Sequence, residues 1–177
     1  EQFSTNRNIS IYLDNSLSMS VPVGEKTSAL DAGIGYVKRI VEVFPPDTRY
    51  RLLTNDFAPF SNSYKTKTEV IDLLTQVRLS PVSRSLNEVK ERIQNLSRVQ
   101  ASGEVFWISD FQQSTVGSLN PLVYDTTQRW HLVPLTYQNN TNIFIDTAYL
   151  ENPFVVGGEK NTLHIRMRND GEKSVEQ

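Results

Sequence analysis

The chain contains no cysteine, and this absence excludes disulfide bonds, thiolate nucleophiles and zinc sites with cysteine ligands. Histidine is almost as scarce. His131 and His164 have no second histidine near them in the sequence, so neither zinc binding nor catalysis is expected of them. No apolar run approaches the roughly 20 residues that a membrane-spanning helix needs. The chemistry of this chain must therefore come from other side chains.

An excess of charge of one sign is also lacking. The 177 residues include 18 Lys and Arg against 20 Asp and Glu, the net charge is -2, and the charges are scattered. This pattern provides neither the basic surface of a nucleic-acid-binding protein nor a polybasic membrane patch. We expect no nucleic-acid partner, and membrane attachment only through segments outside this chain.

The most informative segment is Ile9–Ser20, with the sequence ISIYLDNSLSMS. Its first residues predict a buried strand that ends at Asp14, and two hydroxyl side chains follow at two-residue intervals, Ser16 and Ser18. Ligands of α/β proteins bind at the carboxyl ends of strands, and these oxygen atoms suit Mg²⁺, Mn²⁺ or Ca²⁺. The segment predicts a divalent-metal site. The alternative is that Asp14 or Ser16 only caps a helix or turn.

The residues that follow alternate between helix and strand patterns. An apolar stripe from Leu30 to Phe44 predicts a helix that Pro45-Pro46 ends. Arg49–Phe57 is predicted as the second strand, with a short edge strand at Ala58–Ser61. Capping-box patterns begin two further helices, with apolar positions that include Val70, Leu74 and Val77 in the first, and Val89, Ile93 and Leu96 in the second. The capping pairs are Thr66 with Glu69 and Ser85 with Glu88.

Two more strand patterns, Glu104–Asp110 and Trp130–Leu135, complete the first part of the chain. Alternating strands and helices predict parallel strands covered by helices. We therefore expect residues 1–138 to form an α/β domain with a doubly wound, mostly parallel sheet flanked by helices. A hydrophobic fraction of 38% is enough for its core.

The pattern changes after residue 138. Residues 139–142 (NNTN) are a polar hinge, and the strand patterns Ile143–Leu150 and Thr162–Met167 follow without a helix signal. We interpret residues 139–177 as a hinge and the incomplete start of a β-rich domain, for which an immunoglobulin-like fold is one option.

Asp14 and Asp110 each end a strand, and the predicted strand order makes these strands neighbours. Two close carboxylates repel each other, which favours a cation between them. Ser83, in the loop before the third helix, is a further candidate ligand, although it also fits an ordinary loop serine. Ser85 is better explained as a helix cap, and Asp56 as a turn former.

These motifs together resemble the von Willebrand factor type A domain. The resemblance covers roughly Asn8 to Leu135 and rests on the Asp14-x-Ser16-x-Ser18 loop, on Val82-Ser83-Arg84 and on the strand ending in Asp110. It implies a metal-ion-dependent adhesion site with Asp14, Ser16, Ser18, Ser83 and Asp110 as ligands. Two features depart from the pattern: Ser83 stands where a Thr is usual, and Phe111-Gln112 follow Asp110 in place of the common Gly.

The segments IYLDNSLSMS and FWISDFQ are similar to the BatA-type proteins of Bacteroidetes, which are related to aerotolerance. That resemblance implies membrane helices ahead of the domain, β-rich segments after it and a periplasmic location. It also implies a protein partner whose acidic side chain completes the coordination of the metal ion, most simply Mg²⁺, and no enzymatic activity.

Two other functions stay open. A haloacid-dehalogenase-like, Mg²⁺-dependent phosphatase would use Asp14 as nucleophile, with Thr54 and Asp110 in later motifs. Ser16 then stands where the second carboxylate belongs, and a hydroxyl is a poor general acid near neutral pH. The chain has no Gly-x-Ser-x-Gly motif of a serine hydrolase. The remaining alternative is a metal-free scaffold with the same fold.

Overall fold

The computed structural model describes residues 7–23, 27–97, 103–112, 128–136, 143–152, 154, 157, 158 and 160–169. The chain divides into two compact units, Glu1–Tyr137 and Gln138–Gln177. The predicted hinge at residues 139–142 lies outside the described residues.

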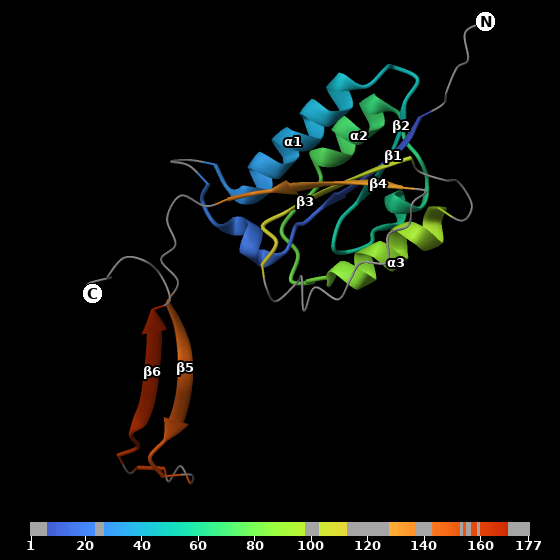
Figure 1. Cartoon of the computed structure of the whole chain (residues 1–177). Helices are drawn as coiled ribbons and strands as arrows, with labels where there is room; N and C mark the ends of the chain where they lie inside the picture. The colour runs from blue at the N-terminus through green and yellow to red at the C-terminus, as the bar shows by residue number, and fades with distance from the viewer. Residues whose placement is uncertain are drawn as a thin grey trace, which may run out of the picture. The chain divides into compact units, whose positions relative to one another are not determined.

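A four-stranded parallel sheet forms the centre of the first unit, so the predicted α/β class is confirmed (Figure 1). Its strand order is β2-β1-β3-β4. The chain thus adds β2 on one side of β1 and returns to add β3 on the other. The strands are β1 (Asn8–Leu13), β2 (Arg49–Leu53), β3 (Glu104–Ser109) and β4 (Arg129–Pro134).

In the part of the chain that the structure describes, three α-helices cover the sheet, α1 and α2 on one face and α3 on the other (Figure 1). They span Ala29–Val43, Lys67–Leu74 and Leu86–Ser97. Both predicted capping boxes form, because Thr66 exchanges hydrogen bonds with Glu69, and Ser85 does so with Glu88. These bonds satisfy amide groups that the first turn of a helix leaves unpaired.

Side chains along β1 point alternately to the two faces of the sheet, and a separate part of the hydrophobic core lies on each face. Ile9, Ile11 and Leu13 pack with α1 and α2, whereas Tyr12 packs with α3. Since side chains of a strand alternate between faces, each strand of this sheet contributes to both halves of the core. The α3 side is aromatic, and the Tyr12 and Trp107 rings meet edge to face with centroids 4.9 Å apart.

Three sequence predictions are corrected by the structure. The second strand ends at Leu53, not Phe57, because Phe57 closes a turn by donating its amide to the Thr54 carbonyl at 3.0 Å. The predicted edge strand at Ala58–Ser61 is instead a 3₁₀ helix, η2 (Pro59–Asn62). Pro59 has no amide hydrogen for a strand pairing, but it fits the first position of a helix.

The helix predicted to include Val77 ends earlier, at Leu74. The amides of Thr75 and Gln76 turn back to Asp72 and Leu73 with tight, three-residue bonds that close the last turn. Val77 is still buried, at 8% exposure. Its apolar character therefore reflects the core of this domain and not the length of the helix.

The second unit contains an antiparallel hairpin of β5 (Ile143–Leu150) and β6 (Leu163–Asn169). One face carries the cross-strand pairs Ile145–Met167, Ala148–Ile165 and Leu150–Leu163, all apolar. The other face carries the pairs Phe144–Arg168, Thr147–Arg166 and Tyr149–His164. The apolar side chains are largely exposed within the described residues, Met167 at 60%.

Among the described residues, no helix is both long enough and apolar enough to cross a membrane.

The close approach of α1 to the sheet provides a test of the packing. A Cβ atom added at Gly33 would lie 2.7 Å from Cδ1 of the fully buried Leu13, whereas one added at Gly35 meets nothing within 4 Å. We predict that Gly33→Ala lowers the free energy of unfolding by about 1 kcal/mol, because overpacking outweighs the gain in helix propensity. Gly35→Ala should raise it by about 0.5–1 kcal/mol. Urea denaturation of both variants measures the difference, and equal stability of the two would contradict this packing.

Candidate functional site

Asp14 follows β1 directly and is almost fully buried, at 3% exposure. Its amide donates to the carbonyl of Ile108 in β3, 2.9 Å away. Its carboxylate accepts three hydrogen bonds, from the Ser16 amide (2.9 Å), the Asn55 side-chain amide (2.8 Å) and the Ser109 hydroxyl (2.7 Å). The bond from Ser16 is the local turn expected of an Asp after a strand. The other two bonds tie Asp14 to the neighbouring strand ends.

Asn55 is held in place by a buried phenol. The Tyr12 hydroxyl donates to the side-chain oxygen of Asn55, which leaves the Asn55 amide nitrogen pointing at Asp14. Burial, and then the nearby charge of Asp14, raise the pKa of Tyr12 well above its usual value. Tyr12 therefore remains a hydrogen-bond donor over the whole physiological pH range.

A second hydrogen bond between an Asn and an Asp joins the same two chain segments in the reverse direction. The Asn15 side-chain nitrogen donates to the Asp56 carboxylate at 3.1 Å, and the Asn15 side-chain oxygen accepts a hydrogen bond from the Asn55 backbone amide at 2.9 Å. The dipeptides Asp14-Asn15 and Asn55-Asp56 thus lie side by side, and each Asn side chain donates to the Asp of the other. This exchange fixes the chain segments that leave β1 and β2.

Asp56 extends the network to a third loop. Its carboxylate also accepts the Ser80 hydroxyl, and the Ser80 backbone amide donates to the Asn15 carbonyl at 2.7 Å. Ser80 forms an isolated parallel bridge with Ser16. Asp56 therefore does lie in a turn, as predicted, but it also holds the loop before α3 against the loop after β1.

The hydroxyl groups of Ser16 and Ser18 lie 3.0 Å apart. Ser16 is buried and precedes the 3₁₀ helix η1 (Leu17–Ser20), whereas Ser18 is half-buried and lies within it. Adjacent ligands in an octahedron with metal–oxygen distances of 2.0–2.1 Å are separated by about 3 Å. The spacing of these two oxygens suits neighbouring positions around Mg²⁺ as well as it suits a hydrogen bond between them.

The other two predicted ligands are less closely connected to this pair. Asp110 is half-buried and follows β3, and its carboxylate lies 3.4 Å from the Ser109 hydroxyl that also bonds Asp14. One hydroxyl thus connects the two carboxylates. Ser83 is exposed in the loop between Ser80 and α3. The structure therefore brings Asp14, Ser16 and Ser18 together, and links Asp110 to them through Ser109.

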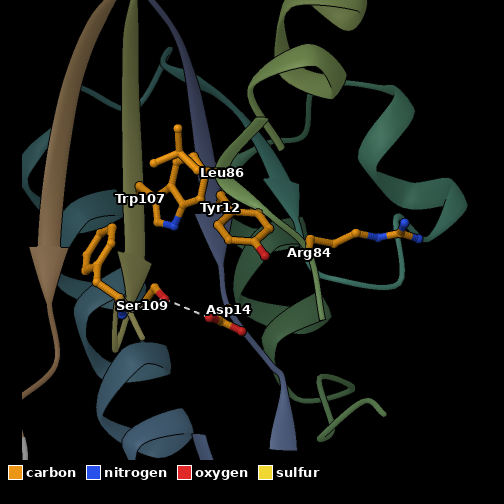
Figure 2. A pocket seen from close by; sticks show the side chains of 7 residues that line it. Tyr12, Asp14, Arg84, Leu86, Trp107 and Ser109 are labelled. Carbon is orange, nitrogen blue, oxygen red and sulfur yellow. Dashed lines mark hydrogen bonds between the residues drawn. The ribbon is translucent and has the colours of Figure 1, made fainter. Parts of the chain in front are cut away.

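A small pocket opens beside Asp14, with an empty volume of about 210 Å³ that includes its solvent-open part. Figure 2 shows the Ser109 hydroxyl directed at Asp14, the Tyr12 and Trp107 side chains nearby, and Arg84 extending away. The lining residues are Tyr12, Asp14, Arg84, Leu86, Trp107, Ser109 and Phe111. Phe111 has a φ of 49°, an uncommon value for a bulky residue. Glycine adopts such a φ readily, so the backbone of this turn after Asp110 is one that the common glycine would also fit.

The donor set decides what this site can bind. A carboxylate offers about four lone-pair positions, so the three hydrogen bonds to Asp14 leave room for one more contact. Among the described residues, no group of three or more His, Cys, Asp or Glu side chains could hold a metal ion. A cation here would thus depend on hydroxyl oxygens in addition to carboxylates. Such ligands suit a hard ion such as Mg²⁺ and fit the predicted chemistry.

Four residues of the network were missed by the sequence analysis: Asn15, Asn55, Ser80 and Ser109. Asn15 and Asn55 each adjoin an Asp just beyond a strand, and this repeated pairing is the one signal that could have identified them. Ser80 gives no such signal, because its role depends on a contact with Asp56, 24 positions away.

The whole chain was compared with known proteins. No family model, curated protein or solved structure matches it. The function must therefore be inferred from the residues of the site.

The hydrogen bond from Asn55 to Asp14 can be tested by replacing the neutral donor with a negatively charged side chain. Asn55→Asp replaces the buried donor with a second carboxylate, and we predict a loss of about 2 kcal/mol or more in unfolding free energy at pH 7. The added carboxyl should have a raised pKa in the folded state, so the penalty is small near pH 4 and grows as the pH rises through that pKa. Urea denaturation at several pH values measures it.

The matched control is Asn87→Asp, which adds the same charge on the exposed first turn of α3. It should leave stability almost unchanged, since an acidic residue is favourable at a helix N-terminus. A similar, pH-independent loss in both variants would show that Asn55 does not face Asp14.

Proposed function

We propose that this chain is a divalent-cation-dependent protein-binding module, with the doubly wound arrangement of a von Willebrand A domain. The observation that carries the proposal is the Ser16–Ser18 hydroxyl pair, spaced at 3.0 Å beside Asp14. The strand order supports it, because ligands of open parallel sheets bind where the order reverses, here at the ends of β1 and β3.

Asp14, Ser16 and Ser18 would hold the ion directly, and Asp110 and Ser83 directly or through water. Mg²⁺ fits this oxygen set, with Mn²⁺ or Ca²⁺ as substitutes. A bound ion supplies positive charge that few carboxylates neutralise, so it attracts an acidic side chain of a protein partner. Binding, and not catalysis, is the proposed outcome.

The resemblance to BatA-type proteins extends the proposal to location. In that arrangement the domain is tethered to a bacterial membrane by segments outside this chain and faces the periplasm. The partner is then an extracytoplasmic protein, or a domain of one, with an exposed Asp or Glu.

A metal-free scaffold is the second candidate, and one observation favours it. Three hydrogen bonds already satisfy most of the Asp14 carboxylate, and Ser109 separates its charge from that of Asp110. The structure of the loop thus has a source of stability that does not involve a cation. Metal titration separates the two candidates.

Divalent metal should stabilise the folded chain, because only the fold brings Asp14 and its hydroxyl neighbours close to Asp110. We predict that Mg²⁺ at a hundredfold excess over its Kd adds about 2.7 kcal/mol to the free energy of unfolding. The measurement is the melting temperature in Mg²⁺, Mn²⁺ or Ca²⁺ relative to EDTA.

Ser18→Ala is the informative variant for this titration. It removes a half-buried hydroxyl, and with it the partner of the buried Ser16 hydroxyl, so the metal response should disappear while stability in EDTA falls by about 1 kcal/mol or less. Ser20→Ala is the control, since Ser20 is exposed and bonds only the local Leu17 carbonyl among the described residues. No metal response in the unmodified chain would favour the scaffold.

The chain should not hydrolyse phosphate esters, even with Mg²⁺, because Ser16 cannot act as the missing acid. The assay is turnover of p-nitrophenyl phosphate by the unmodified chain and by Asp14→Asn. Turnover that is lost in Asp14→Asn would replace the binding module with a phosphatase.

A further inference from the structure

Arg51 carries a positive charge into the interior of the first unit. It lies in the middle of β2 with 2% of its surface exposed, among the largest fully buried side chains. Its guanidinium stacks on the Tyr64 ring, 4.1 Å from the ring centre. Its Nε and Nη1 atoms have no hydrogen-bond partner among the described residues. A buried charged donor without an acceptor is costly, so this side chain calls for an explanation.

Arg51 faces the α3 side of the sheet. Leu53, two residues further along β2, packs in the α3 half of the core, and alternate residues of a strand share a face. Ser10 is opposite Arg51 in the β1–β2 register and shares this face with Tyr12. The Ser10 hydroxyl is also buried without a partner in the described part of the chain.

A second arginine approaches from α3. Arg92 donates from Nη2 to the Asn62 side-chain oxygen at 2.6 Å, which places it against the end of η2. Its Nε is buried and lacks a partner among the described residues, as does the hydroxyl of Ser61 in η2. Unsatisfied donors thus lie on β1, β2, η2 and α3, and Arg92 and Arg51 contact Asn62 and Tyr64, two positions apart in one segment.

The charged groups named so far in this cluster are both positive. Burial lowers the pKa of Arg51, the Tyr64 phenol opposes that change, and the Arg92 charge lowers it further. In the described part of the chain, neither arginine takes part in an ion pair with a carboxylate. Their contacts with Asn62 and Tyr64 place both guanidinium groups beside the same short segment, where the two positive charges disfavour each other.

We propose that Arg51 and Arg92, with Ser10 and Ser61, form a binding site for a tetrahedral dianion such as phosphate or sulfate. Two negative charges balance two guanidinium groups, and four oxygens can accept from donors that arrive from four elements. A carboxylate offers one charge and two oxygens. The site is separate from the proposed metal site and does not depend on the proposed function.

The test is a titration of the 177-residue chain in EDTA, with sodium phosphate, sodium sulfate or sodium acetate at constant ionic strength. EDTA removes divalent metal, so phosphate cannot act through the other site. We expect a saturable rise in melting temperature with phosphate and sulfate, and none with acetate or chloride. Calorimetry should give one site per chain.

Two variants assign the site. Arg92→Gln keeps a donor to Asn62 and removes one charge, and it should weaken phosphate binding roughly tenfold or more. Arg51→Met should abolish binding, and it should melt no lower than the unmodified chain without phosphate, since an apolar side chain replaces an unpaired charge. Arg39→Gln, on the exposed face of α1, removes the same charge and should leave binding unchanged.

A phosphate response that equals the chloride response would show that only water satisfies these donors and would overturn the proposal. An equal response to acetate would show a general anion effect and would also overturn it. If Arg51→Met does not fold, Arg92→Gln decides: unchanged affinity contradicts the site, and weakened affinity beside a normal Arg39→Gln supports it.

Discussion

The candidate site depends on the parallel pairing of β1 with β3. This pairing places Leu13 opposite Ile108 and fixes the Asp14 amide on the Ile108 carbonyl. The next residues, Asp14 and Ser109, then lie side by side at the carboxyl ends of these strands, and their side chains meet. β1 also pairs with β2 on its other side, so Asn55 reaches the same carboxylate. A central strand is the one position from which two neighbours can supply these donors.

Burial of Asp14 makes its neighbours interdependent. A carboxylate at 3% exposure needs donors, and each donor must be aimed by a further contact. Tyr12 orients Asn55, the Phe111 amide donates to Ser109 at 3.1 Å, and the Ser80 amide holds the Asn15 carbonyl. Part of the specificity of this edge therefore lies in residues that would never contact a metal ion or a partner.

Local signals in the sequence predicted most of the fold. The capping pairs Thr66–Glu69 and Ser85–Glu88 lie three residues apart, so both partners are visible in one helix turn. The strand ends at Asp14 and Asp110 were visible for the same reason. The 3₁₀ helix at Pro59–Asn62 was missed because its apolar residues, Phe60 among them, fit a strand pattern equally well. Asn55, Ser80 and Arg51 were missed because their roles depend on partners that are far away in the sequence.

The hairpin of the second unit contains a register shift between Ile145 and Thr147, beside Asp146. An extra residue at such a bulge reverses the alternation of faces along one strand. Without it, Thr147 and Tyr149 would fall on the face of Ile145, and Ala148 and Leu150 would move to the face with the arginines. Asp146 is thus the extra residue that shifts the alternation of side chains between the two faces. Because of this shift, the apolar residues before and after Asp146, Ile145 on one side and Ala148 and Leu150 on the other, lie on the same face of the hairpin.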